Sequence, residues 1–513
     1  MKKFFKLLAL GGAICAVGVA TACNDDDSTI VDKNITYETI TTPENQKAYQ
    51  ATIDCSGLLN AALPDRYNDL DVYSVEVVNG ETLTSFDFKN TSRLIKLGGC
   101  SKLTSIDISG FDVVDSGALR DCTAATTVRV KELRFLNQSA TGDSYLTYFS
   151  ALYGPTYTAE DGSTQPIPQA LQKVYVESGD IDKGFTRCDT LKEVELSLDV
   201  KTIGTGAFEG LDNLESVKTS CTSIESGAFT DCPSLKTVDL GKNLTSLGAN
   251  AFSNCTALES ITLPDTLTSL EKSVFDGCTA LTSVDLGDSI ESINLWAFDG
   301  CTSLSELYIP GSVKTIIEPS YDVCSIQSIY YEGGYDDWAQ IEFDSQSLSG
   351  EQASNYLDAN VYFRYEGTSY VTASNGSRYA TCEELSFSNV SEINDYAFAG
   401  DSNIKSIIFS RNVETIGNYA FANCENLEYI VILNDDIKIH TDAFYSCTKL
   451  TKVLLVGDPA SLIGLTAPVS VAPFVSDFAS NTFYFYTPNN GNETESGNWW
   501  YFSGSEPVCY TVD

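Results

Sequence analysis

Three segments of the chain repeat one pattern: AFSNCTALESITLP at residues 251–264, VFDGCTALTSVDL at 274–286 and AFDGCTSLSELYIP at 297–310. Phe252, Phe275 and Phe298 follow one another at intervals of 23 residues, and Cys, Leu and two closing apolar positions return in the same register. A fixed period of roughly 20–29 residues is typical of chains whose turns each bury an apolar face against the next turn. The sequence therefore predicts a solenoid of stacked turns.

The repeat extends in both directions from these segments. Further turns are marked by Phe185, Phe208, Phe229, Tyr321, Phe398, Phe421 and Phe444. Each is followed by an L-x-x-φ-x-φ core, where φ is apolar, and this core is the pattern of leucine-rich repeats. The predicted fold is a right-handed leucine-rich-repeat solenoid with repeats of about 23 residues, α/β by convention but dominated by β-structure.

The N-terminus has the features of an export signal. Three lysines lie within the first six residues, an apolar run follows at 7–19, and small residues precede Cys23. Residues 1–22 are predicted to be a signal peptide. Cys23, which is followed by the acidic stretch 24–27, resembles the lipidated Cys of Bacteroidetes lipoproteins. The resemblance implies that Cys23 is lipidated and anchors the chain in an outer membrane, with display on the cell surface. Ordinary cleavage before Cys23 is the alternative.

The remaining boundaries follow from where the repeat pattern begins, lapses and resumes. The predicted segments are 23–50, the lipidated Cys and a tether; 51–80, an N-terminal cap; 81–328, leucine-rich repeats with an insertion near 131–168; 329–380, a second insertion; 381–456, further repeats; and 457–513, a C-terminal cap. Caps are expected because the end turns of a solenoid would otherwise expose their apolar faces.

Charge and composition exclude several classes of function. The chain has 31 Lys and Arg against 70 Asp and Glu, a formal charge of -39, and such a surface repels nucleic acid. Cysteines that share one repeat position, Cys232 among them, are expected to stack as buried thiols, with disulfides between neighbours left open. The only His is His440, so we predict no catalytic residues, no metal, no cofactor and no enzyme activity. A hydrolase that uses the 131–168 insertion is a remote alternative.

The position between the last two apolar residues of each core should face outward from the main sheet. Along the chain it is occupied by Glu195, Lys218, Asp239, Thr262, Asp285, Tyr308, Tyr330, Ile408, Val431 and Leu454. The change from polar to apolar residues indicates a contact surface. The predicted ligand-binding residues are Tyr308, Tyr330, Ile408, Val431 and Leu454, together with the neighbouring Tyr429. Burial of these residues beneath the second insertion or the C-terminal cap is the alternative.

Three features together are similar to the BspA-type leucine-rich-repeat family of bacterial surface proteins. These are the A-F-x-x-C-x-x-L core, the IYYEGG segment at 329–334 followed by Trp338 and Ile341, and the aromatic C-terminal segment from 483 to 508. The resemblance covers roughly residues 80–513. It implies a surface-anchored adhesion or binding protein that presents a concave repeat face to a host-matrix or bacterial protein or to a glycan. We expect contact with membranes only through the lipid anchor, because no other apolar run of the sequence is long enough to cross a bilayer. A scaffold subunit of an outer-membrane complex is the alternative.

Overall fold

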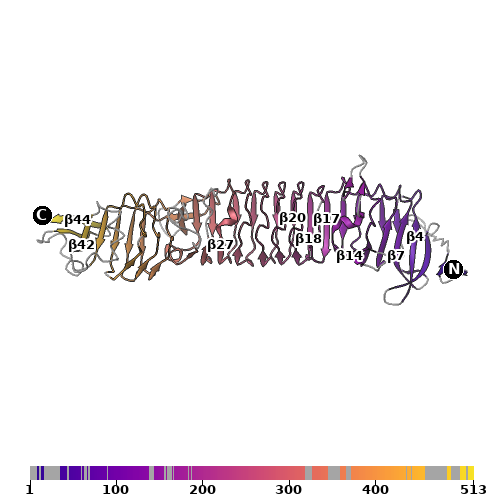
Figure 1. Cartoon of the computed structure of the whole chain (residues 1–513), viewed down its shortest axis with the longest axis horizontal. Coiled ribbons are helices and arrows are strands. Elements are labelled where there is room, and N and C mark those ends of the chain that lie inside the picture. The colour runs from indigo at the N-terminus through magenta and orange to yellow at the C-terminus, as the bar shows by residue number, and fades with distance from the viewer. Residues whose placement is uncertain are drawn as a thin grey trace. The chain divides into compact units, whose positions relative to one another are not determined.

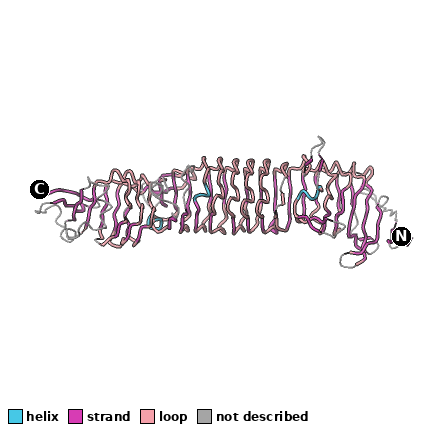
Figure 2. The backbone as a smooth tube through the Cα atoms, in the orientation of Figure 1, coloured by secondary structure: helices cyan, strands magenta, loops and turns pink. Residues whose placement is uncertain are grey.

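The structure is a computed structural model. It describes residues 8–10, 13–16, 35–42, 46–58, 60–62, 66–67, 70–88, 91–137, 144–154, 157–158, 164–165, 167–182, 184–185, 188–317, 326–344, 359–364, 371–434, 436–440, 442–456, 482–486, 497–503 and 506–512. The chain divides into two compact units, residues 1–264 and 265–513. In both units strands and turns predominate over helices (Figure 2). Within the described segments, no helix has the length and apolar character needed to cross a membrane.

Unit 1 is built on a six-stranded parallel sheet in the order β10-β12-β17-β18-β20-β22. Its strands are β10 (Ser105–Asp107), β12 (Thr127–Val130), β17 (Lys173–Ser178), β18 (Glu193–Asp199), β20 (Ser216–Lys218) and β22 (Thr237–Asp239). Figure 1 shows β17, β18 and β20 side by side. Val128, Val174, Val194 and Val217 are in register on successive strands and are buried, so one apolar column lies beneath the sheet.

A short second strand closes many turns. In unit 1 these strands are β19 (Thr202–Ile203), β21 (Ser223–Ile224) and β23 (Ser246–Leu247). The N-terminal part contains β1 (Leu8–Leu10), β2 (Ala13–Ala16), β3 (Ile35–Thr41), β4 (Lys47–Asp54), β5 (Asn60–Ala62), β6 (Arg66–Tyr67), β7 (Leu70–Val78), β8 (Ser85–Asp87), β9 (Arg93–Leu97), β11 (Val113–Asp115), β13 (Phe135–Asn137) and β14 (Ser144–Leu146). The 3-10 helix η1 (Phe149–Tyr153), β15 (Tyr157–Thr158), β16 (Thr164–Gln165) and β24 (Ser260–Thr262) complete the unit.

Among the described residues of unit 2, two sheets contain the main strands and two sheets contain the short second strands. The second main sheet ends in the C-terminal strands of the chain. The order β28-β30-β32-β34-β33 comprises Glu306–Ile309, Ser328–Tyr331, Asn360–Arg364, Arg378–Thr381 and Val371–Thr372. The order β35-β37-β39-β41-β42-β43-β44 comprises Glu384–Phe387, Ser406–Phe409, Tyr429–Ile432, Lys452–Leu455, Thr482–Tyr486, Gly497–Ser503 and Glu506–Val512. The short strands are β25 (Ser269–Leu270), β27 (Ser292–Asn294), β29 (Thr315–Ile317), β31 (Glu342–Asp344), β36 (Glu392–Ile393), β38 (Thr415–Ile416) and β40 (Lys438–Ile439). The remaining elements are β26 (Ser283–Asp285), η2 (Leu295–Phe298) and α1 (Tyr335–Trp338).

The predicted period is confirmed by the strand register. Ile224 pairs with Leu247 in unit 1, and Ile407 pairs with Ile430 in unit 2, each one turn of 23 residues later. Stacked phenylalanines maintain the same spacing from turn to turn. Ring centroids are 4.7 Å apart for Phe185 and Phe208 and 4.9 Å apart for Phe208 and Phe229, and aromatic stacking adds to the energy of burial. The chain is therefore a β-dominated leucine-rich-repeat solenoid.

The cysteines of the repeat form hydrogen bonds between adjacent turns in addition to packing in the core. The described cysteines are free thiols, and most of those in the repeat column donate to the backbone carbonyl of the Phe one turn earlier. The Sγ–O distances are 3.1 Å for Cys232 to Phe208, 3.3 Å for Cys255 to Phe229, 3.2 Å for Cys301 to Phe275, 3.3 Å for Cys424 to Phe398 and 3.0 Å for Cys447 to Phe421. A thiol in this position links adjacent turns by a weak hydrogen bond as well as by packing.

The residue before six of the repeat cysteines has a left-handed backbone. The φ values are 57° at Asp231, 59° at Asn254, 72° at Gly277, 66° at Gly300, 56° at Asn423 and 58° at Ser446. Gly, Asn and Asp tolerate this conformation best because a bulky Cβ would collide with the backbone. This requirement explains why the second x of A-F-x-x-C is Gly, Asn, Asp or Ser in these six turns.

Part of the segment predicted as an insertion near 131–168 belongs to the core. Phe149 stacks on Phe185 with ring centroids 5.4 Å apart, and Leu152 and Tyr153 are fully buried. The backbone N–H of Phe149 donates to the carbonyl of Gly184, as in an ordinary repeat turn. Residues 149–153 therefore head the phenylalanine column, which the sequence pattern did not reveal because Phe149 lacks a following cysteine.

Candidate binding surfaces

The predicted site residues Tyr308 and Tyr330 lie on the neighbouring strands β28 and β30. Their rings stack with centroids 5.1 Å apart, and Tyr362 on β32 continues the stack at 5.1 Å from Tyr330. We call these three residues the tyrosine ladder. The hairpin β33–β34 lies on this ladder, with the ring of Tyr379 centred 4.7 Å from that of Tyr330. Tyr330 is only 5% exposed, so the expectation that it faces solvent is wrong.

Hydrogen bonds fix the hairpin on the ladder. The hydroxyl of Tyr308 donates to Glu306 Oε2 at 2.7 Å, and the hydroxyl of Ser374 donates to the same carboxylate. Burial would raise the pKa of Glu306, but these hydrogen bonds outweigh it and lower the pKa. The hydroxyl of Tyr379 donates to Glu332. The hydroxyls of Tyr308 and Tyr379 are thus paired within the chain.

The other predicted site residues lie beneath the C-terminal strands. Val431 and Leu454 are 0% and 1% exposed and form a cluster with Trp500 of β43, while Ile408 and Tyr429 are half-buried at its edge. The indole N–H of Trp500 donates to a backbone carbonyl of β41 at 3.0 Å. The alternative left open by the sequence is therefore what the structure shows: both the second insertion and the C-terminal segment cover the apolar positions. A role of these residues in ligand binding stays a prediction without the exposed surface that motivated it.

Two further predictions concern residues away from these surfaces. Cys23 lies outside the described residues, so its lipidation stays a prediction. His440 is exposed. Among the residues that the structure describes, no group of three or more His, Cys, Asp or Glu side chains has the geometry of a metal site.

In unit 1 the outward side chains of β12, β17 and β18 form a different kind of surface. We call it the Tyr175 face, and it comprises Arg129, Lys173, Tyr175, Glu193 and Glu195. The guanidinium carbon of Arg129 lies 4.2 Å from the ring centroid of Tyr175, and Lys173 Nζ lies 4.6 Å from it. Contact of two cations with one ring is favourable because the face of the ring is electronegative.

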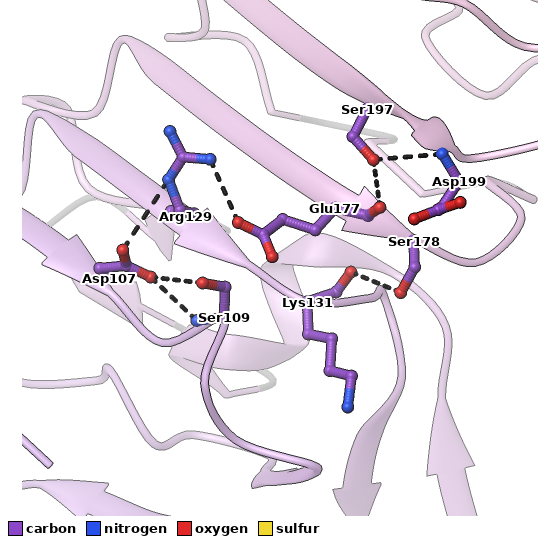
Figure 3. A network of polar contacts seen from close by, with 8 residues as sticks. All are labelled: Asp107, Ser109, Arg129, Lys131, Glu177, Ser178, Ser197 and Asp199. Carbon is purple, nitrogen blue, oxygen red and sulfur yellow. Dashed lines mark hydrogen bonds and ion pairs between the residues drawn. The ribbon is translucent and has the colours of Figure 1, made fainter. Parts of the chain in front are cut away.

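Carboxylates pair with both cations. Lys173 Nζ lies 2.6 Å from Glu193 and 3.0 Å from Glu195. Burial lowers the pKa of Lys173, but its hydrogen bonds to Glu193, Tyr175 and Glu195 outweigh this and raise it. Arg129 lies between Asp107 at 3.9 Å and Glu177 at 3.2 Å (Figure 3). These side chains remain in contact with water, since Arg129 is 38% exposed and Glu177 is 43% exposed.

Some acidic residues beside this face build turns. Asp107 accepts from the N–H and the hydroxyl of Ser109 at 3.0 and 2.7 Å (Figure 3). Asp239 accepts from the N–H of Gly241 at 3.1 Å. Short side chains that cap a turn in this way are expected where a strand ends. Asp239, which shares the outward position with Tyr175 and Glu195, therefore has a structural partner.

An exposed apolar residue lies at the end of the same sheet. Alternation along β18 would direct Leu198 inward together with Val194 and Leu196. The pairing of β17 with β18 shifts register between Val176 and Ser178, and Leu198 is instead 62% exposed. The exposed leucine adds apolar area to a sheet whose outward face carries a tyrosine and an arginine, residue types that are enriched at protein contacts.

The sequence reasoning missed Arg129 and Tyr175. Their strands pair directly, with Arg129 opposite Tyr175, although residues 131–172 separate them in the chain. That interruption hid the register. The signal that could have revealed it is the shared φ-x-φ motif, Val128-Arg129-Val130 and Val174-Tyr175-Val176.

The stacked turns, the phenylalanine column and the strand faces define a leucine-rich-repeat protein. Residues 181–287, 222–349 and 377–462, nearly half of the chain, match the BspA type leucine rich repeat region in six copies. The repeat arrays of this chain belong to that family, which points to an extracellular or cell-surface protein that binds protein partners.

Solved structures of the same kind are similar over most of the chain. A leucine-rich repeat protein from Bacteroides ovatus is 19% identical, with 89% of this chain and 99% of that chain covered and a TM-score of 0.40. A leucine rich cell surface protein from Faecalibacterium prausnitzii is 17% identical, with 82% and 87% covered and a TM-score of 0.29. Comparison with curated protein sequences gives no match.

Proposed function

We propose that this chain is a surface-anchored binding protein that holds a protein partner on the Tyr175 face. The observation that carries the proposal is the contact of Arg129 and Lys173 with the ring of Tyr175 on strands whose outward side chains remain accessible to water. Tyr and Arg are enriched among residues that dominate binding energy, because they offer a large contact area and hydrogen bonds together. The ion pairs hold both side chains in place before a partner arrives, which lowers the entropic cost of binding.

The charges of this face favour a folded protein as the partner. Two positive groups, Arg129 and Lys173, lie between the carboxylates of Asp107 and Glu195. A surface of mixed sign is complementary to another surface of mixed sign and repels partners that carry a single charge. Leu198 supplies an apolar contact at the end of β18.

The test compares variants of one residue type in two places. Purified chain with Tyr175→Ala is assayed by surface plasmon resonance against immobilised extracellular-matrix and plasma proteins, and against outer-membrane proteins of the producing cell. The half-buried Tyr445 of unit 2 provides the control, Tyr445→Ala. We expect the Tyr175 variant to lose about tenfold or more in affinity and the control to retain it. Equal affinity of both variants and the wild-type chain would remove the proposal. A bacterial ligand instead of a host ligand would favour the scaffold role over adhesion.

The surface anchor is tested separately. We propose that Cys23 carries the lipid, because it follows the predicted signal peptide directly. Cys23→Ser should abolish incorporation of a labelled fatty acid and move the chain from the membrane fraction to the soluble fraction. Continued labelling of the variant would show that Cys23 is not the lipidated residue.

A further inference from the structure

A polar groove of about 630 Å³ lies in unit 2 where the turns before β30, β32, β37 and β39 meet. Its volume is within the range of ligand clefts, roughly 300–1,000 Å³. The polar side chains that line it are Gln327, Asn360, Ser402, Asn423 and Glu425. Clefts for drug-like molecules are lined mainly by apolar side chains. A polar lining indicates a ligand that makes many hydrogen bonds.

A buried carboxylate supports one wall of the groove. Asp401 occupies the position that cysteine holds in most other repeats, since AFAGD at 397–401 aligns with AFANC at 420–424. Its side chain is buried and accepts hydrogen bonds from the backbone N–H groups of Asn403 at 2.9 Å and Val361 at 3.4 Å. The thiol of Cys424 meets a carbonyl, whereas at Asp401 the neighbouring turn presents an N–H, which needs an acceptor.

This support fixes the orientation of Asn360. Asn360 Oδ1 accepts from the backbone N–H of Ser402 at 3.0 Å and from its hydroxyl at 2.9 Å. A backbone N–H can only donate, so the atom facing Ser402 must be the oxygen of the amide. The amide N–H₂ of Asn360 is therefore the group left to contact a ligand.

Two further side chains are available in the groove. Within the described part of the chain, Gln327 and Glu425 make no side-chain hydrogen bond, and both are exposed. The amide of Gln327 donates and accepts, and the carboxylate of Glu425 accepts two hydrogen bonds. The groove thus presents oriented donors and acceptors on three different turns.

We propose that this groove binds a neutral, hydroxyl-rich glycan. Sugar hydroxyls donate and accept at once, and a carboxylate can receive two adjacent hydroxyls while amides serve their neighbours. The exposed Glu425 and the formal charge of -39 disfavour sulfated or uronic-acid glycans. A protein partner would need an apolar anchor, and the apolar residues of the described lining are Ala359 and Gly400, which offer little contact area.

The proposal is independent of the Tyr175 face, which belongs to the other unit. Tyr175→Ala should leave glycan affinity unchanged, so loss of protein binding and loss of glycan binding can be told apart.

The experiment uses the full chain on an array of neutral polysaccharides, mannan, xylan and galactan, with polygalacturonate and heparin as anionic comparisons. Oligosaccharides of the polysaccharide that binds best are then titrated by calorimetry. We expect Glu425→Gln, which keeps shape and removes charge, and Asn360→Ala each to weaken binding about five- to tenfold. Asn412→Ala serves as the control, because Asn412 is an exposed turn residue that donates to Ser388 O away from the groove.

Three results would overturn the proposal. They are the absence of binding to all neutral polysaccharides, a preference for the anionic ones, and unchanged affinity in the Glu425→Gln variant. Glu425 is exposed, so its substitution should leave folding intact. The Glu425→Gln result therefore decides the matter even if Asn360→Ala impairs folding.

Discussion

The outward strand faces of the two units differ in their exposure: one is accessible to water and the other is covered by further strands of the same unit. On the Tyr175 face of unit 1, Arg129 pairs with Asp107 and Glu177, Lys173 pairs with Glu193 and Glu195, and these side chains stay accessible to water. In unit 2, Tyr330 and Val431 lie at the matching outward positions and are buried by other parts of the same unit. Beneath both faces the turns share the same phenylalanine and cysteine columns.

The difference shows that outward residues, and not the repeat, decide how a face is used. An apolar stripe in water is a liability that a chain covers or offers to a partner. Unit 2 covers its stripe with β33–β34 and with β43. Mixed charges with one aromatic ring need no cover, because water solvates them. The Tyr175 face, which a search for exposed apolar residues would not select, is consequently the accessible one.

The strongest test of the comparison removes one tyrosine from each unit. Tyr379 is 1% exposed and packs on the tyrosine ladder, so Tyr379→Ala should lower the free energy of unfolding of unit 2 by about 3–5 kcal/mol. Tyr175 is only partly buried, so Tyr175→Ala should cost less than about 1 kcal/mol. Urea unfolding followed by circular dichroism measures both.

A conservative variant separates packing from hydrogen bonding. Tyr379→Phe keeps the ring and loses the hydroxyl that donates to Glu332, so it should cost about 1 kcal/mol. Similar losses for the alanine variants at 175 and 379 would contradict the idea that one face is covered and the other is open.

The second test uses the single charged residue that replaces a column cysteine. Burial raises the pKa of Asp401 to about 7, against the effect of its two backbone hydrogen bonds. The folded chain therefore binds more protons here than the unfolded chain between its ordinary pKa near 3.8 and pH 7, and stability falls as pH rises through that window. Asp401→Asn lacks this titration. Relative to wild type, its unfolding free energy should rise by about 2 kcal/mol between pH 5.5 and 8.

Thermal unfolding at several pH values measures this difference, and subtraction of the wild-type curve removes the contribution of all other carboxylates. Glu384→Gln, at an exposed position of β35 in the same unit, is the control for the effect of replacing a carboxyl by an amide. A flat difference for Asp401→Asn would mean that this carboxyl titrates as it does in the unfolded chain.

The sequence predicted the positions that recur in each turn but not the elements that interrupt the repeat and cover its faces. The period, the buried phenylalanines and the thiol column were readable because each position recurs every 23 residues, as Phe229 and Phe252 show. Covering elements do not recur. Nothing in the local pattern around Tyr379 or Trp500 indicates which face either residue packs on, since that depends on the pairing of β34 with β32 and of β43 with β42.

The candidate surface was predicted with the right positions and the wrong exposure. The outward direction of Tyr308, Tyr330 and Val431 follows from strand alternation alone. Their burial follows from tertiary contacts with residues 40 or more positions later in the chain, such as Tyr379 with Tyr330 and Trp500 with Val431. Arg129 and Tyr175 were missed for a related reason. They lie opposite each other on paired strands, but residues 131–172 separate those strands in the sequence.

A third test asks whether the interiors of the two units are as alike as their faces are different. Cys232 in unit 1 and Cys424 in unit 2 are both fully buried and donate to a Phe carbonyl at 3.1 and 3.3 Å. Replacing either by Ala removes a buried sulfur and leaves a small cavity, so each variant should lose about 1–2 kcal/mol. Losses that differ by much more than the experimental error would show that the shared column supports the two units unequally.

The smallest expected effect concerns the ion pairs of the Tyr175 face. Exposed salt bridges contribute between about 0 and 1 kcal/mol each, because water and side-chain entropy offset their attraction. Arg129→Gln with Lys173→Gln breaks the pairs to Glu177, Glu193 and Glu195 and should reduce the unfolding free energy by less than about 1 kcal/mol. The same double variant should bind the protein partner at least tenfold more weakly. A small loss of stability together with a large loss of affinity would show that these side chains serve binding and not folding. A large loss of stability would instead show that this network stabilises unit 1.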